Sequence, residues 1–337
     1  MHRWFLGSLV LLLLSGCNRS DSRANRADTA GSNGSKRVRI AVIPKGTTHV
    51  FWKSVHAGAE RAAAELRGKG IDVEIQWKGP LLENDREGQI NVVQDFVAQR
   101  VNGIVLAPLD STALIPAVLD ARKAGIPTVI FDSALADEAA IVSYVATDNY
   151  HGGSLAAREI GTRLAGQGNV ILLRYYVGSE STEQREQGFL ETMHKEFPNI
   201  TILSDDQYSG TTPLEAQNKA LELCNQFGGR LDGFFAVCEP NTVGVLGALE
   251  QEGLAGKVKF VGFDPGPQLV PALAAGKIHG LVLQDPVIMG YLSVLTLVAH
   301  LQGEKVEKRI PTGEVMATPE NMKSPEIQKL LYPEQAD

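Results

Sequence analysis

From residue 38 to residue 284 the sequence alternates short β-branched and aliphatic runs with longer amphipathic stretches. The stretches between the runs carry apolar residues at i, i+3 and i+4, which predicts helices. Continuous apolar strands covered by helices on both faces are typical of parallel, doubly wound sheets. Because ten strands are too many for one small sheet, we predict an α/β fold of two Rossmann-like lobes. The predicted strands are 38–43, 72–77, 103–107, 127–131, 141–146, 169–175, 200–205, 233–238, 258–263 and 280–284.

The first 36 residues differ in kind from the rest. A basic start and an apolar run over 4–14 predict a secretory signal over 1–16, too short to span a bilayer. The following "LSGC" resembles a bacterial lipobox, so we expect Cys17 to be lipidated and to anchor the mature protein to a membrane. Residues 17–36 are polar and rich in Ser, Asn and Gly, and they predict a flexible tether. The expected location is extracytoplasmic, at the membrane surface of the periplasm or cell.

Composition excludes several classes of function. The net charge is −7 and no block of Lys or Arg occurs, so nucleic-acid binding lacks its electrostatic footprint. Besides Cys17 there are two cysteines. Cys224 lies near the end of a predicted helix, which should abut the start of strand 233–238, and Cys238 lies at the far end of that strand. Their expected separation of roughly 16 Å along a strand is too long for a disulfide, so two free, buried thiols are expected. No Cys/His spacing indicates a metal site, and no cofactor is predicted.

Ligands of parallel α/β sheets bind beyond the carboxyl ends of the strands. Aromatic, charged and amide side chains recur at that topological position. No nucleophile with a base and an orienting group stands among them, so we predict a binding protein rather than an enzyme. The candidates are His49, Phe51, Trp52, Asp132, Ser133, Arg185, Tyr208, Cys238, Asp264 and Gln284.

This set of side chains suits a sugar or polyol. Carboxylates and Arg form charge-assisted bonds with hydroxyls, which both donate and accept. The C–H faces of a sugar ring favour the negative face of an aromatic ring. Phe51 and Trp52 therefore predict a ring platform, although adjacent aromatics can equally cover the core. Asp132 and Asp264 have helix N-caps as an alternative role, and Arg185 has a surface ion pair with a neighbouring Glu.

Longer motifs carry a family resemblance over about residues 37–318. These are "THVFWKSVHAGAERAAAEL", "GIVLAPLDSTALIPAVLDARKAGIPTVIFDS", "ATDNYHGGSLAA", "REQGF" and "VGFDPGPQLVPALAAGKIHGLVLQDPVIMGY". With the lipobox, they resemble the type I periplasmic sugar-binding proteins of ABC importers, the ribose/galactose class related to LacI effector domains. The resemblance implies a monomer with one small sugar or polyol between the lobes, a three-crossover hinge and an ABC permease as partner. It also implies an N-terminal lobe of 37–146 plus 285–312 and a C-terminal lobe of 147–284 plus 313–337.

The resemblance also assigns roles to the candidates. Phe51 and Trp52 would flank the ring with His49 beside them, and Tyr208 would be a wall from the second lobe. Hydroxyls would be bound by Asp132, Arg185, Asp264 and Gln284. Ribose binders carry an Arg where this chain has Ser133, and an Asn where it has Cys238, so ribose itself is not the expected ligand. A ligand sensor for a membrane kinase or chemoreceptor stays open as an alternative, and an α/β enzyme as a weaker one.

Overall fold

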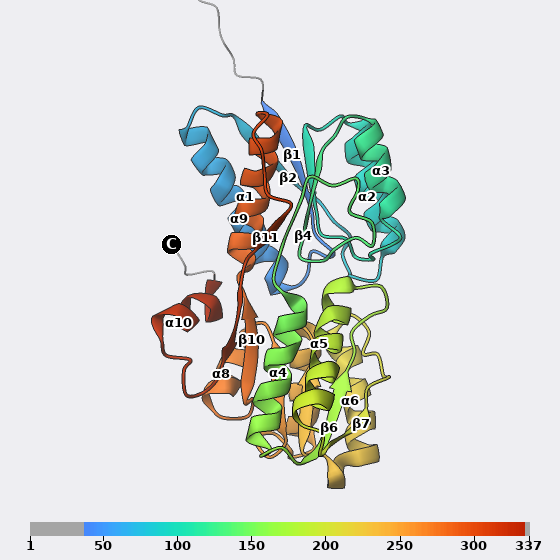
Figure 1. Ribbon diagram of the computed structural model, residues 1–337, viewed down its shortest axis with the longest axis vertical. Coiled ribbons are helices and arrows are strands. Elements are labelled where there is room, and N and C mark those ends of the chain that lie inside the picture. Colours follow the sequence, from blue (N-terminus) through green and yellow to red (C-terminus); the bar gives the residue numbers. More distant parts are fainter. Residues whose placement is uncertain (1–36, 334–337) are drawn as a thin grey trace, which may run out of the picture. The chain divides into compact units, whose positions relative to one another are not determined.

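The computed structural model describes residues 37–333. The predicted signal segment, the lipidation of Cys17 and the tether lie outside the described residues. Two six-stranded sheets form the centres of two α/β lobes (Figure 1). The ten short apolar strands that the sequence predicts are all present as β1 to β10. Their ends differ from the predicted ones by at most two residues. No helix within 37–333 is long and apolar enough to cross a membrane.

The first lobe is built on a sheet with the strand order β11-β5-β4-β3-β1-β2, all of whose pairings are parallel. Its strands are β1 (Val38–Ile43), β2 (Val73–Trp77), β3 (Gly103–Leu106), β4 (Thr128–Phe131), β5 (Ser143–Ala146) and β11 (Arg309–Pro311). Helices cover both faces, as the apolar character of the strands requires. The helices are α1 (Val50–Gly68), α2 (Arg86–Ala98), α3 (Ile115–Lys123) and α9 (Pro286–Leu301).

The second lobe repeats this order as β12-β10-β9-β8-β6-β7, with β12 antiparallel to β10. Its strands are β6 (Gly168–Leu173), β7 (Ile200–Ser204), β8 (Gly233–Ala236), β9 (Lys259–Phe263), β10 (Gly280–Gln284) and β12 (Glu314–Ala317). Its helices are α4 (Asn149–Arg163), α5 (Glu180–Glu196), α6 (Pro213–Phe227), η1 (Gly228–Arg230), α7 (Glu239–Gln251), α8 (Leu269–Ala274) and α10 (Pro325–Leu331).

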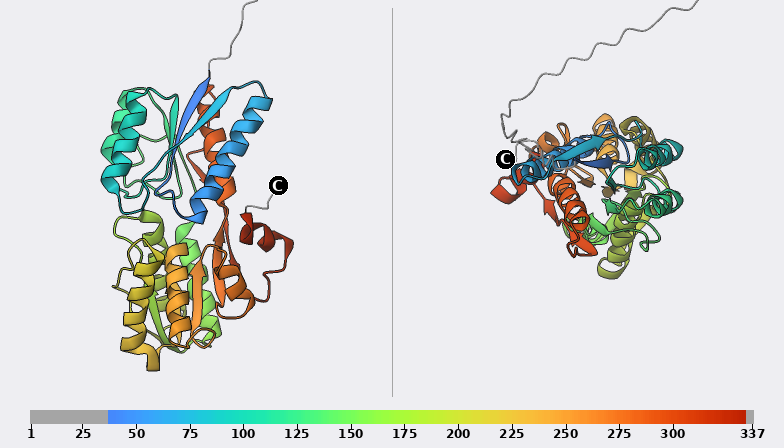
Figure 2. Two further views of the ribbon diagram at one scale, coloured as in Figure 1. Left: turned by 180° about the vertical axis from the view of Figure 1, so that it is seen from behind. Right: turned by 90° about the horizontal axis from the view of Figure 1, so that it is seen from above.

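The chain passes between the lobes three times. It crosses between β5 and α4, between β10 and α9, and between β11 and β12. As a result α9, which comes after the second sheet in sequence, packs beside α1 on the first sheet (Figures 1 and 2). These three crossing segments connect the two lobes in the way that a hinge connects two rigid bodies.

Each sheet has a hydrophobic core on both faces. In the first lobe one core lies under α1 and α9, and the other under α2 and α3. In the second lobe α4 and α5 cover one face, while α6, α7, α8 and α10 cover the other. The crossing of α4 and α5 depends on Gly153, because a Cβ there would lie 2.0 Å from the carbonyl oxygen of Arg185. This close approach sets the position of Arg185 at the interface of the lobes.

Candidate functional site

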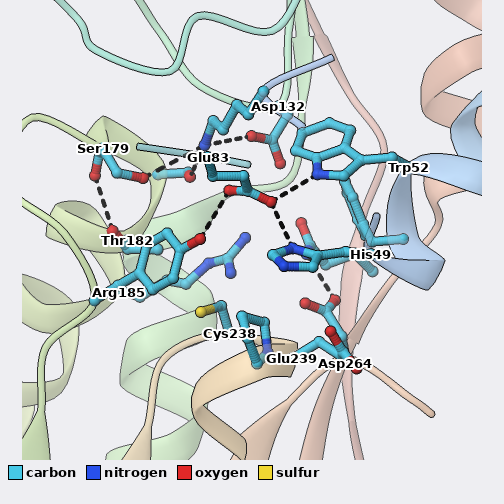
Figure 3. Close-up of a pocket in the computed structure, with 16 residues that line it drawn as sticks. His49, Trp52, Glu83, Asp132, Ser179, Thr182, Arg185, Cys238, Glu239 and Asp264 are labelled. Atoms are coloured by element: carbon cyan, nitrogen blue, oxygen red, sulfur yellow. Dashed lines mark hydrogen bonds and ion pairs between the residues drawn. The ribbon is translucent and has the colours of Figure 1, made fainter. Parts of the chain in front are cut away.

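A cavity lies where the carboxyl ends of the two sheets meet, and both lobes line it (Figure 3). The space open to the centre of a water-sized sphere is about 40 Å³. At about 10–15 Å³ for each water, this space holds roughly three waters. The lobes are therefore closed on one another in this structure, and the cavity must widen before a sugar-sized ring can enter it.

Two aspartates occupy equivalent positions in the two lobes. Asp132 directly follows β4 and Asp264 directly follows β9, the fourth strand of each lobe's five-strand repeat. Both have left-handed backbones, with φ of 63° and 64°. Each N–H donates to the strand next to it, at 3.1 Å to Val145 O and 2.8 Å to Val282 O. A positive φ costs about 1–2 kcal/mol for a residue with a side chain, and such strain is typical of functional positions.

In the first lobe a lysine neutralises its aspartate. Lys45 Nζ lies 2.8 Å from Asp132 Oδ2, and both side chains are about 5% exposed. The same ammonium donates to Ser181 Oγ at 3.0 Å and lies 3.4 Å from Ser179 Oγ. Because both serines belong to the second lobe, Lys45 joins the lobes as well as pairing with Asp132.

Glu83 accepts three hydrogen bonds at the centre of the cavity wall (Figure 3). Its donors are Trp52 Nε1 at 2.7 Å, His49 Nδ1 at 2.6 Å and the hydroxyl of Tyr175 at 3.0 Å. Burial alone would raise the pKa of Glu83, but the bond to His49, the charges of His49 and Lys45, and the indole N–H lower that pKa to about 2. Burial opposes the charged imidazolium, yet Glu83 raises the pKa of His49. Since Tyr175 lies in the second lobe, Glu83 also bridges the lobes.

Arg185 is held rigidly by neutral groups. Its Nε donates to Asn149 Oδ1 at 2.9 Å and its Nη1 to Val237 O at 3.0 Å. The guanidinium carbon lies 3.8 Å from the centroid of the Phe263 ring, a cation–π contact. The side chain is only 2% exposed, and its hydrogen bonds within residues 37–333 go to neutral oxygens. A buried, preorganised guanidinium of this kind is suited to bind ligand oxygens.

The second-lobe wall of the cavity holds two further carboxylates. Gln284 Nε2 donates to Asp264 Oδ1 at 2.8 Å, and Glu239 begins α7. Burial raises the pKa of Asp264 to about 6, against the opposing charge of Arg185. Burial likewise raises the pKa of Glu239 to about 7, and the charges of Asp264 and Glu83 add to the effect.

The comparisons with known proteins agree with this geometry. A family model described as a periplasmic binding protein domain matches residues 40–305. The chain belongs to that family. The ribose import binding protein of Bacillus subtilis is 28% identical over 306 residues, 90% of this chain and 94% of its own.

Solved structures of solute-binding proteins share the architecture. An ABC transporter solute binding protein from Agrobacterium vitis with bound D-fucose is 35% identical, with a TM-score of 0.82, covering 87% of this chain and 100% of its own. A carbohydrate transporter solute binding protein from Agrobacterium radiobacter in complex with D-arabinose is 32% identical, also with a TM-score of 0.82, covering 88% and 99%. These relatives are named as import or transporter binding proteins, and this chain shares the fold of the two solved ones.

Most of the sequence-predicted residues of this solute-binding protein come together at the cavity. The lining includes His49, Phe51, Trp52, Asp132, Arg185, Cys238, Asp264 and Gln284. The alternative N-cap role does not apply to Asp264, because Gln268 caps the helix that follows it. Nor does the surface ion pair apply to Arg185, since the buried contacts above hold it. Trp52 lines the cavity and also belongs to the core under α1, so its position is compatible with both alternatives.

Two predicted residues lie elsewhere. Tyr208 is 39% exposed and lies under the guanidinium of Arg174, outside the cavity lining. The expected second-lobe wall is therefore wrong for this conformation, and Tyr175 stands there instead. Ser133 is fully buried, and its hydroxyl accepts from the N–H of Ser181 across the lobes at 3.1 Å. Ser133 thus contacts the opposite lobe rather than the cavity.

The structure adds residues that the sequence reasoning missed. Lys45 and Glu83 from the first lobe and Tyr175 and Glu239 from the second all line the cavity. Cys224 and Cys238 are free and buried, as predicted. Burial raises the pKa of both thiols, that of Cys224 to about 11. Within residues 37–333 no group of three or more potential metal ligands occurs.

Proposed function

We propose that this protein captures a small sugar or polyol in the cavity and delivers it to an ABC permease by opening and closing its two lobes. The observation that supports this most strongly is a cavity lined from both lobes by buried carboxylates, an arginine and an indole. Such groups satisfy hydroxyls in pairs. The sugars bound in the two solved relatives, D-fucose and D-arabinose, carry several hydroxyls of this kind.

In this proposal Arg185, Asp264, Gln284 and Asp132 bind hydroxyls, and Trp52 with Phe51 contacts the ring. Closure depends on hydrogen bonds that run between the lobes. Besides Lys45 and Glu83, these include Ser111 N–H to Gly178 O at 3.0 Å and Ala134 N–H to Glu180 Oε2 at 2.9 Å. A ligand that contacts both lobes stabilises this closed form, and the permease reads the closed surface.

The further attributes complete the proposal. The lobes consist of 37–146 plus 285–312 and of 147–284 plus 313–337, and the protein works as a monomer without metal or cofactor. It catalyses no reaction. Lipidation at Cys17 and the segment that follows hold it at a membrane outside the cytoplasm.

The test is a thermal-shift screen of the chain with Cys17→Ser against pentoses, hexoses, deoxysugars and sugar alcohols. A ligand that binds only the native state adds about 2.7 kcal/mol of stability at a concentration of 100 Kd. That is several degrees in melting temperature for a chain of this size. We expect one narrow group of sugars to respond, and Arg185→Ala to lose the response. A full panel without any response would overturn the sugar assignment.

A further inference from the structure

The second-lobe end of the cavity has two side chains whose acceptors have no donor among residues 37–333, Gln284 and Glu239, and a third, Asp264, that accepts from Gln284 and from the backbone N–H of Glu239. Gln284 is 2% exposed, and its Oε1 is buried without a hydrogen-bond partner. Within residues 37–333 no hydrogen bond or ion pair holds the carboxylate of Glu239. Asp264 has Gln284 Nε2 as its side-chain donor, at 2.8 Å. We call these three side chains the acceptor corner, and all three line the cavity.

The charges in the cavity do not balance at this corner. In the first lobe Lys45 pairs with Asp132 at 2.8 Å, and His49 pairs with Glu83 at 2.6 Å. Within the first-lobe wall, the positive and negative charges of each pair therefore compensate one another. The second-lobe wall has Arg185 as its single lining cation against the two carboxylates of the acceptor corner. The lining thus has one more carboxyl group than cationic side chains, and the cation that acts on Glu239 is His49 from the opposite lobe.

The pKa values of the corner show how its carboxyl groups respond to their surroundings. Burial raises the pKa of Glu239 to about 7; the charge of His49 opposes that rise, and the charges of Asp264 and Glu83 add to it. The pKa of Asp264 is raised to about 6, again chiefly by burial. Because burial is the first cause of both shifts, they show that ionisation of either carboxyl is costly in this dry site, and a cation bound beside the carboxylates would stabilise their ionised forms.

The donor count distinguishes a hydroxyl from an ammonium group. A hydroxyl donates one hydrogen and presents two lone pairs, whereas an ammonium donates three hydrogens and presents none. A corner of three acceptors satisfies an ammonium completely, whereas the lone pairs of a hydroxyl there depend on donors from outside the corner, such as Arg185. The positive charge also compensates the uncompensated carboxylate, which a neutral hydroxyl cannot do.

We propose that the acceptor corner binds a protonated amine, so that the ligand class is an amino sugar or an amino polyol rather than a neutral sugar. This inference rests on the proposed function and names its substrate class. Arg185 and the Lys45–Asp132 pair then bind the remaining hydroxyls. Glu239 is the residue that discriminates an amine from the hydroxyl in its place.

The experiment compares matched pairs at pH 7 by isothermal titration calorimetry on the full chain with Cys17→Ser. The pairs differ only in an amine for a hydroxyl: glucosamine and glucose, galactosamine and galactose, mannosamine and mannose, and 1-amino-1-deoxysorbitol and sorbitol. We expect at least one amine to bind tenfold or more tightly than its parent. In Glu239→Gln the ratio for that pair should fall to about one, while Glu252→Gln, an exposed carboxylate at the end of the same helix, should leave the ratio unchanged.

The outcomes separate the two proposals. If a neutral parent binds as tightly as its amine or more tightly, the amine inference is overturned and the sugar-binding function stands. An unchanged ratio in Glu239→Gln, with an unligated melting temperature equal to that of the unmodified chain, also overturns the inference. If no member of any pair binds, and the wider sugar panel is silent too, the proposed function itself fails.

Discussion

The turn before α5 contacts the first lobe through its residue Gly178. The Gly178 carbonyl accepts from Ser111 N–H at 3.0 Å, and its φ is +93°. A Cβ built at this position would lie 2.4 Å from Asp110 Oδ2. Asp110 cannot give way, because its carboxylate accepts from the N–H of Thr112 at 2.9 Å and pairs with Arg86 at 2.8 Å. We therefore expect Gly178→Ala to prevent full closure of the lobes.

The magnitude follows from the contacts that closure forms at this turn. Separating the lobes here loses the Ser111–Gly178 bond and the bond from Arg86 Nη2 to Val177 O at 2.6 Å. At a net value of about 1 kcal/mol for each bond, closure becomes about 2 kcal/mol less favourable. Because about 1.4 kcal/mol corresponds to a factor of ten, the ligand found in the screen should bind roughly 30-fold more weakly. The backbone strain of Ala at positive φ acts on both open and closed forms, so it lowers the melting temperature but not the affinity.

Gly303→Ala is the matched control. Gly303 follows α9 with a φ of +84°, and a Cβ there meets no atom within 4 Å. This variant carries the same kind of backbone strain without a contact between lobes. Calorimetry gives the affinities, and small-angle scattering of the unligated proteins reports whether Gly178→Ala is more open. The reasoning would be refuted if the two variants bound the ligand with equal affinity, or if the affinity of Gly178→Ala lay within twofold of that of the unmodified chain.

Three further results are expected. Tyr175→Phe removes a hydrogen bond to the ionised Glu83 across the lobes and should weaken ligand binding about tenfold by calorimetry; unchanged affinity would mean that this bond does not aid closure. Burial lowers the pKa of His279 to about 4 in the folded chain. As the pH falls, this imidazole is therefore protonated at a higher pH in the unfolded chain than in the folded one. The stability that this gives is complete above pH 6.5 and is lost as the pH falls toward 4; in urea titrations, His279→Gln should lessen the loss between pH 7 and 5, and an identical loss would contradict this origin. Cys224 and Cys238 should react with a thiol reagent only after unfolding in guanidinium, in a chain with Cys17→Ser, and rapid reaction of the native protein would contradict their burial.

Much of the candidate site could be predicted from the sequence, because in a parallel sheet the carboxyl ends of all strands lie at the same edge. Asp132, Asp264 and Gln284 each lie at the carboxyl end of a central strand, and all three line the cavity. The strands β11 and β12 were not predicted, because three or four residues at a crossover carry no readable apolar pattern. Those strands form through pairing with β5 and β10, which is information that only the tertiary structure holds.

The errors have a common physical origin at the edges of the sheets. Tyr208 follows β7, the edge strand of its sheet, so its segment lies beside the cavity rather than above it. Glu83 also follows an edge strand, β2, yet it reaches the cavity because its loop folds back over the turn after β1. Thr47 fixes that loop through bonds to Leu81 O at 3.4 Å and Pro80 O at 3.3 Å. The path of such a loop depends on tertiary contacts, which periodicity does not encode.

The repeat of one fold in two lobes makes their differences informative. Lys45 lies two residues after β1, and the equivalent place after β6 holds Tyr175. Both lobes keep an aspartate with positive φ after the fourth strand, so the backbone feature is shared while its neutralising lysine is not. The charge of Arg185 acts on Asp264, and no second cation of that lobe lines the cavity beside Glu239 among the described residues. The proposed amine supplies the positive charge that the second-lobe wall lacks. The difference points to a ligand with polarity of its own, whose cationic end faces the second lobe.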